Sequence, residues 1–336
     1  MDSNINLKQT EAIFKKGVDA LKTSFFKFKF NPDYLSGVSY FTDAGINYKK
    51  LKYFKESINS FNQAIICNKH LNERYAEGKN QIELADIYIF ELKDNNEGLK
   101  CIEQAVYSYK VAGKFSMGVK IYLDFAEKCM NNLNGEFAMK LYKMCFEDCY
   151  EFTHDDLARI TLEEGVSKLV DCFSLYNKHA EALDYINKYI KKQLSLNNEK
   201  KNKITKNYVK TIMIRLILKE DFVCDDIVSA MYNTYDSGCG DDIEDAKQLI
   251  KAFKEVNNKK FNDLMKYSFD FYENNLLKNL RKSFEQRVKD EEQGFQVEKP
   301  MSKSEINEIF PEKEEVIEET GKKDQQVGGN FADDQI

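Results

Sequence analysis

The feature that most restricts the fold of this chain is a run of 267 residues, Asp33 to Lys299, without a single proline. Proline makes up about 5% of average sequences and interrupts helices, so such a run favours one helix after another. Glycine is also scarce, and stretches that alternate Val, Ile and Thr are hard to find. Sandwiches, barrels and doubly wound sheets are therefore excluded in favour of an all-α fold.

An internal repeat predicts how these helices are arranged. Four segments begin with a small residue and an aliphatic one, and carry large apolar residues three and seven positions after the aliphatic. Their small residues are Ser57, Gly98, Ala138 and Ala182, at intervals of 41, 40 and 44 residues. The position four after the aliphatic is always polar, which indicates an amphipathic helix with its apolar stripe facing inward.

Another apolar helical stretch precedes each of these helices, so the unit is an antiparallel hairpin in which the small residue lets the two backbones approach closely. One hairpin cannot bury its apolar face alone. We therefore expect a right-handed solenoid resembling tetratricopeptide repeats, whose usual period is about 34 residues. Residues 1–285 would form this domain, with repeats to about 204 and a helical cap over about 205–285. A stacked array has a concave face, which usually holds another chain.

Acidic residues are concentrated after this domain. Residues 286–336 hold 14 acidic and seven basic side chains, whereas the net charge of the whole chain is only -6. We expect a disordered acidic tail, and a broadly basic nucleic-acid binder is disfavoured. Eight scattered cysteines, a polar start and no apolar run near 18 residues predict a cytoplasmic protein without a membrane span.

Catalytic and metal-binding motifs are missing from the sequence. There is no phosphate-binding glycine loop, no nucleophile elbow and no zinc-protease motif, so we expect no enzyme, no cofactor and no metal. Cys145 and Cys149 share a helical face, but buried small side chains are the better interpretation. The acidic residues near Asp241 lack the spacing of a calcium loop and suit a helix start. His179 is expected to be a solvated loop residue.

The most informative local feature is an alternation of phenylalanine and lysine between the first two expected helices. A helix does not have period two, and a strand would have no sheet to join. An exposed loop of this kind suits an anionic membrane surface, because each buried Phe contributes up to about 1.5–3 kcal/mol and each Lys about 1 kcal/mol. The membrane-contact residues would be Phe25, Phe26 and Phe28 with Lys27 and Lys29. The alternative is that two or more of the Phe side chains, Phe30 foremost, pack into the first hairpin.

The stretch from Leu21 to Lys29, followed by Pro32-Asp33-Tyr34, resembles the loop Lys-Thr-Gly-Phe-Leu-Lys-Trp-Lys-Pro-Asp-Tyr of the soluble NSF attachment proteins, gamma type. The likeness continues through the hairpins to about Arg281. The resemblance implies an adaptor without chemistry of its own, peripherally associated with membranes. It would bind the SNARE four-helix complex and recruit the hexameric ATPase NSF, which disassembles that complex.

The resemblance also implies particular binding residues. The stretch from Gly113 to Lys120 is similar to the alpha-type stretch Gly-Arg-Phe-x-x-Ala-x-Lys, so Lys114 and Lys120 would contact SNAREs, and Arg159 falls near another such basic position. Glu163 or Glu164 stands where the alpha type has a further Lys. A solvated surface Lys is the alternative for each cation.

The family's C-terminal end engages the ATPase through acidic residues and a penultimate Leu. Here Asp333 and Asp334 would serve, and Ile336 would replace the Leu although it is the last residue. The alternative for this segment is a solubilising tail. For the whole protein, the alternative is a tetratricopeptide-type scaffold or co-chaperone, although its clamp of Lys, Arg and Asn cannot be assembled at repeat-consistent positions.

Overall fold

The computed structural model describes residues 6–23, 30–151, 156–196, 201–234, 240–270, 272 and 274–293, with the backbone alone for 201–203. These residues form fourteen α-helices and no strand, which confirms the all-α fold. The helices are α1(Leu7–Leu21), α2(Tyr34–Lys50), α3(Phe54–Leu71), α4(Arg74–Asp86), α5(Asn95–Val111), α6(Phe115–Asn131), α7(Gly135–Glu151), α8(Asp156–Leu175), α9(His179–Ser195), α10(Lys201–Ile217), α11(Cys224–Thr234), α12(Gly240–Lys254), α13(Asn258–Tyr267) and α14(Asn274–Glu292). A π-helical segment, η2(Ile87–Glu91), continues α4, and a short 3₁₀ segment, η3(Asp221–Val223), precedes α11.

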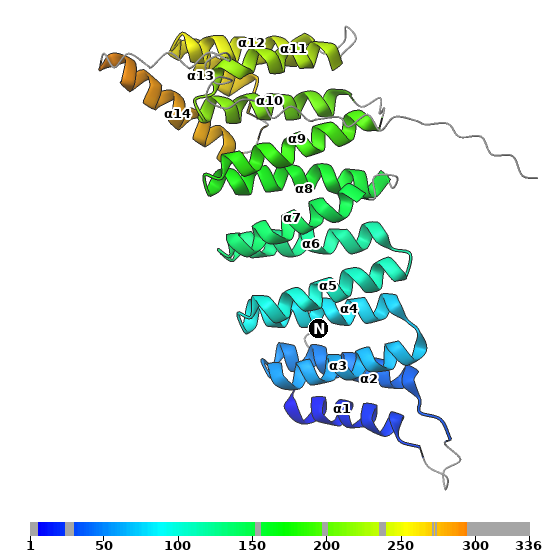
Figure 1. The fold of residues 1–336 in the computed structure, drawn as a ribbon. Coiled ribbons are helices and arrows are strands. Elements are labelled where there is room, and N and C mark those ends of the chain that lie inside the picture. Colours follow the sequence, from blue (N-terminus) through cyan, green and yellow to red (C-terminus); the bar gives the residue numbers. More distant parts are fainter. Residues whose placement is uncertain are drawn as a thin grey trace, which may run out of the picture.

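The helices stack as antiparallel hairpins along one axis (Figure 1). The four repeated segments of the sequence fall on α3, α5, α7 and α9, each the second helix of a hairpin. Their partners α2, α4, α6 and α8 are the first helices. The predicted solenoid is thus confirmed. In Figure 1 the turns within hairpins follow the left edge, and the turns between hairpins follow the right edge.

One turn geometry joins the two helices of every hairpin. A residue with positive φ ends each first helix, and the next N–H donates to the carbonyl oxygen five residues back, or six after η2. This hydrogen bond satisfies a carbonyl that the helix end would leave unpaired. The positive-φ residues are Lys52, Lys93, Leu133, Asn177, Lys219 and Val256. The last two follow α10 and α12, so the repeat turn continues into the region that the sequence assigns to a cap.

The small residues of the repeat lie where the two helices of a hairpin touch. Ser57 is buried and its hydroxyl donates to the carbonyl oxygen of Gly45 at 2.7 Å. Gly98 lies against Ile89 of η2, where an added Cβ would be 2.3 Å from Ile89 Cγ1. Ala138 and Ala182 are fully buried. The close approach expected from the sequence is thus seen at Ser57 and Gly98, and the burial of Ala138 and Ala182 agrees with it.

The last helix folds back onto the solenoid. The backbone N–H of Asn275, in the first turn of α14, donates to the Asp171 carboxylate of α8 at 2.8 Å, and its side chain does the same. Further along, the ring of Phe284 stacks on Phe261 of α13 at 3.9 Å. Helix α14 continues to Glu292, beyond residue 285 where the sequence places the end of the helical domain. Residues 294–336 lie outside the described residues.

Candidate partner-binding face of the first helices

The first helices of successive hairpins lie side by side and form one continuous surface, here called the first-helix face. Lys49 of α2 pairs with Asp86 at the end of α4 at 2.7 Å, and Asp86 also pairs with Lys128 of α6 at 3.2 Å. Glu127 of α6 in turn pairs with Lys168 of α8 at 2.7 Å. The order of these contacts is the order of the hairpins, so the face runs from α2 to α8.

Asp86 connects three hairpins and its ionisation depends on its partners. Burial raises the pKa of Asp86, but hydrogen bonds and charge from Lys49, together with Lys128, outweigh burial and hold that pKa below its usual value. Burial lowers the pKa of Lys49, yet its hydrogen bonds to Asp86 and Glu83 raise the net value. Both groups therefore stay charged at neutral pH, and the network ties neighbouring hairpins together.

The positive-φ turn residue gives each first helix a common register. Thirteen residues before it, or fourteen in the helix that η2 lengthens, the first helices α2, α4, α6, α8 and α10 each carry an exposed residue, whereas in α12 the same position is the buried Ile243. We call these positions the Lys120 row, and its members are Ser39, Lys79, Lys120, Glu164 and Lys206. Three of the five are lysines, and Glu164 is the one acidic member. The row is a line of mainly positive charge that crosses the hairpins.

The predicted SNARE-binding residues lie at or near one edge of this face. Lys120 is exposed in the row itself, and Lys114 is exposed at the N-cap of α6. Neither forms an ion pair with any residue in the described ranges. Arg159 lies in the first turn of α8, is partly buried, and pairs with Asp156. Lys114 and Arg159 thus begin neighbouring first helices, although part of the Arg159 charge is neutralised.

In α2, α4 and α6 an acidic side chain lies one turn after the member of the Lys120 row, whereas in α8 and α10 that position is a lysine. Asp124 lies beyond Lys120, and burial raises its pKa although the charge of Lys120 lowers it. A hollow of about 380 Å³ opens beside Asp124, with Ile82 of α4 and Phe125 of α6 among its lining residues. A second hollow, of about 300 Å³, lies between α6 and α8. The face therefore combines cations, carboxylates and small apolar depressions.

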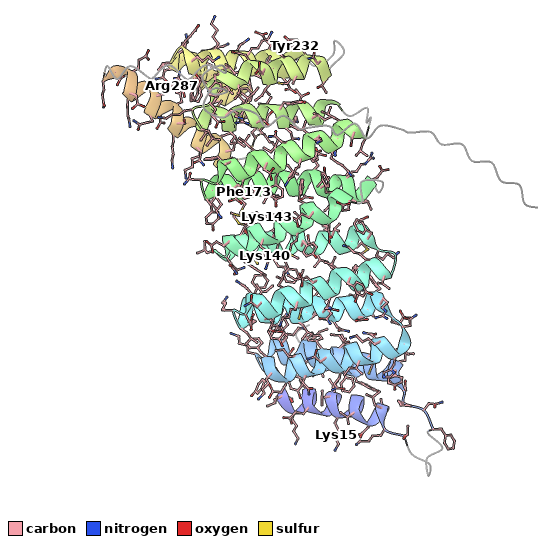
Figure 2. All side chains as sticks on the ribbon, in the orientation of Figure 1. Lys15, Lys140, Lys143, Phe173, Tyr232 and Arg287 are labelled. Atoms are coloured by element: carbon pink, nitrogen blue, oxygen red, sulfur yellow. The ribbon has the colours of Figure 1, made fainter. Side chains whose placement is uncertain are left out.

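Several cations of the second helices are engaged within the protein, although Lys55 of α3 and Lys140 of α7 form no ion pair among the described residues. Lys110 pairs with Asp148 at 2.7 Å, and Lys143 pairs with Glu181 at 2.8 Å. Lys143 also lies 5.1 Å from the centre of the Phe173 ring, as can be followed in Figure 2. These contacts bind one hairpin to the next. The lysines of the first-helix face that lack such partners are the better candidates for contact with another molecule.

Sequence reasoning missed two members of the row, Lys79 and Lys206. The spacing of the second helices was visible in the sequence, but the first helices were not aligned. In α4 the π-helical residue shifts the register by one, so a fixed spacing would select Asn80, which is buried. Lys206 belongs to α10, beyond the four repeats that the sequence pattern shows.

The predicted membrane-contact residues Phe25, Phe26, Phe28, Lys27 and Lys29 lie outside the described residues. Two apolar side chains beside this segment are described. Phe30 is 61% exposed and Leu35 of α2 is 73% exposed. The predicted ATPase-binding residues Asp333, Asp334 and Ile336 also lie outside the described residues.

The expectation for His179 is wrong. Its side chain is 7% exposed at the start of α9, and burial lowers its pKa. Position in a short turn suggested solvation, and residues 175–178 of the turn are indeed exposed, but His179 is the first residue of α9 and its side chain is buried. Cys145 and Cys149 are buried free thiols, as expected, and the hydrogen bond between them and burial raise the pKa of Cys145.

The described part of the chain contains no cluster of three or more His, Cys, Asp or Glu side chains that would hold a metal ion. Within the same ranges, every helix is too short or too polar to cross a membrane.

A stacked array of helical hairpins with an open, charged face defines a helical-repeat protein of the kind that binds other chains. The family model described as "Soluble NSF attachment protein, SNAP" matches residues 8–290. The chain therefore belongs to the soluble NSF attachment protein family. No protein with a curated description matched the chain.

Proposed function

We propose that this protein is a non-enzymatic adaptor of the gamma type, which binds the SNARE four-helix complex and recruits the NSF ATPase to disassemble it. It would act in the cytoplasm, on the surface of membranes. The observation that carries the proposal is the family match over residues 8–290. The Lys120 row supports it, because its lysines present positive charge on several successive hairpins to an elongated acidic partner. Residues after about 290 would form the acidic tail.

SNARE contact is tested by charge reversal on the first-helix face. Lys114→Glu with Lys120→Glu should weaken retention of a SNARE bundle about tenfold, because two lost attractions of about 0.7 kcal/mol each amount to one decade. The matched control is Lys55→Glu with Lys140→Glu, which changes the charge equally on the exposed side of α3 and α7. Equal binding by the two double variants would refute the role of these lysines. Binding of acidic C-terminal peptides in place of SNAREs would favour the co-chaperone alternative.

Membrane contact is tested by changing Phe25, Phe26 and Phe28 to Ser. Co-sedimentation with anionic liposomes should fall tenfold or more, because about 1.4 kcal/mol is one decade and each Phe contributes up to about 1.5–3 kcal/mol. Exposed Phe30 and Leu35 beside this segment support the proposal. A fall in melting temperature of many degrees would show that the three side chains stabilise the fold instead.

ATPase recruitment is tested by deleting residues 333–336. The deletion should leave SNARE and lipid binding intact and reduce both stimulation of the ATPase and disassembly. Ile336→Ser alone should produce part of the loss, because one docked aliphatic side chain contributes at most about 1.5–3 kcal/mol. Wild-type disassembly by the deletion variant would refute the role of Asp333, Asp334 and Ile336.

A further inference from the structure

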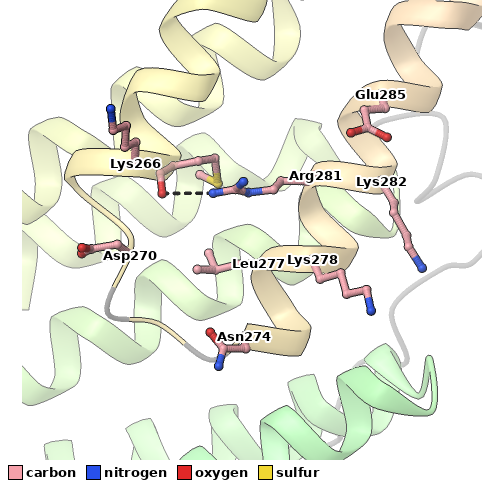
Figure 3. A pocket seen from close by; sticks show the side chains of 9 residues that line it. Lys266, Asp270, Asn274, Leu277, Lys278, Arg281, Lys282 and Glu285 are labelled. Atoms are coloured by element: carbon pink, nitrogen blue, oxygen red, sulfur yellow. Dashed lines mark hydrogen bonds between the residues drawn. The ribbon is translucent and has the colours of Figure 1, made fainter.

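A positively charged groove of about 660 Å³ lies between the end of α13 and the first half of α14 (Figure 3). Buried Met265 and Leu277 contribute its apolar part. Four cations and two carboxylates line the remainder, namely Lys266, Lys278, Arg281 and Lys282, and Asp270 and Glu285. The groove therefore carries an excess of positive charge in a chain whose net charge is -6.

The three cations of α14 that line the groove differ in their contacts. Arg281 extends across the groove and donates to the carbonyl oxygen of Met265 at 3.4 Å. Lys278 and Lys282 are exposed, one turn apart on α14, and neither pairs with a carboxylate in the part of the chain that the structure covers. Their charges are available to an anionic partner.

We propose that the occupant of this groove is the chain's own segment from Glu305 to Glu319. These fifteen residues hold seven glutamates and one lysine, which complements the cations of the groove. The same segment carries Ile306, Ile309 and Phe310, which suit the apolar part beside Leu277. The segment therefore matches the groove both in charge and in apolar character.

The connection is long enough for this contact. Helix α14 ends at Glu292, and Lys278 lies fourteen residues earlier, about 21 Å back along the helix at 1.5 Å per residue. The thirteen residues from Glu292 to Glu305 span up to about 45 Å when extended. A short connection also gives the segment an effective concentration of about 1 mM at the groove, so even a weak contact is occupied.

Docking has a consequence for the end of the chain. With residues 305–319 held beside α13 and α14, the final seventeen residues are restrained near the same end of the solenoid. These include Asp333, Asp334 and Ile336, so occupancy of the groove would regulate access to them. The docking itself does not require SNARE or ATPase binding, and it is tested separately from them.

The first test is zero-length carbodiimide cross-linking of the full chain, diluted so that monomers dominate. We expect amide links from Lys278 or Lys282 to glutamates within 305–319 in the monomer band, and their loss in 1 M salt, where the screening length is about 3 Å. Links from this segment to Lys55 and Lys140 in equal yield would overturn the proposal.

The second test uses a fluorescent peptide of residues 305–319 and a full-length chain whose seven glutamates in that segment are changed to Gln. The peptide should bind this chain with a Kd below about 0.1 mM, and the wild-type chain at least about tenfold more weakly, because its own segment competes at an effective concentration of about 1 mM. In the Gln chain, Lys278→Glu with Lys282→Glu should weaken binding tenfold or more, whereas Lys55→Glu with Lys140→Glu should not. Circular dichroism melting checks that each variant is folded.

Two results would overturn docking in this second test. The first is equal peptide binding by the wild-type and Gln chains. The second is no peptide binding, together with retention of the protein on phosphatidylserine vesicles through Lys278 and Lys282, which would assign the groove to a membrane surface.

Discussion

Replacing Gly98 with alanine should destabilise the hairpin of α4 and α5. An added Cβ at this position would lie 2.3 Å from Ile89 Cγ1 and 2.9 Å from Ile89 Cδ1, both too close for carbon atoms. Ile89 is 2% exposed and belongs to η2, so it has no free space into which to move. The added methyl must therefore displace either a buried side chain or the helix pair.

The size of the effect follows from two opposing contributions. Overpacking of a well-filled core costs about 1–3 kcal/mol, and the depth of this overlap places Gly98→Ala at the upper end. Alanine recovers about 1 kcal/mol of helix propensity over glycine. The free energy of unfolding should therefore fall by about 2 kcal/mol.

Gly165→Ala is the matched control. Gly165 is also a buried glycine within a helix, but the nearest atom to an added Cβ is Cys145 Sγ at 3.5 Å, an ordinary contact. This variant should gain about 0.5–1 kcal/mol, since only the propensity changes. The two alanine variants should thus differ by about 2–3 kcal/mol in opposite directions.

Urea unfolding followed by circular dichroism at 222 nm measures the difference. Because repeat arrays do not always unfold in one step, amide hydrogen exchange in α4 and α5 should accompany it and should show faster exchange only in Gly98→Ala. If Gly98→Ala unfolds at the same urea concentration as Gly165→Ala, the close packing between η2 and α5 is refuted.

Three further changes have expected outcomes. Leu133→Gly should raise the free energy of unfolding by about 0.5–1 kcal/mol in thermal melts. Leu133 has φ of 59° and is 95% exposed, so glycine relieves the backbone strain without loss of packing. A lower melting temperature would contradict this prediction. Asp86→Asn should cost about 1–2 kcal/mol at pH 7. The pKa of Asp86 is depressed in the folded state, so the stability that the Asp86 carboxylate contributes is present above about pH 4 and is lost as pH falls through the folded pKa. The stability difference between wild type and Asp86→Asn should therefore shrink in urea titrations at lower pH. A difference that does not depend on pH would refute the ion pairs. Asp171→Ala should lower the free energy of unfolding by about 1–2 kcal/mol and speed proteolysis of α14, because it removes the acceptor of the Asn275 N–H. Unchanged proteolysis would refute the anchoring of α14.

Local patterns in the sequence were sufficient for the type of fold. The missing prolines and the positions of Ser57, Gly98, Ala138 and Ala182 determine helices with one apolar stripe, and such helices are stable only when stacked. Burial of the repeated small residues also followed from the pattern. These features depend on neighbours within a few turns of one helix, so the sequence displays them directly.

Contacts between distant segments were decided only by the tertiary structure. The π-helical residue in η2 shifts Lys79 into the Lys120 row, and the sequence has no local signal for that shift. Helix α14 is anchored to Asp171 across 104 residues, and His179 is buried although the turn residues just before it are exposed. Periodicity specifies which face of a helix is apolar, but not which distant helix covers it. The first-helix face and the groove beside α14 therefore exist only once the hairpins are stacked.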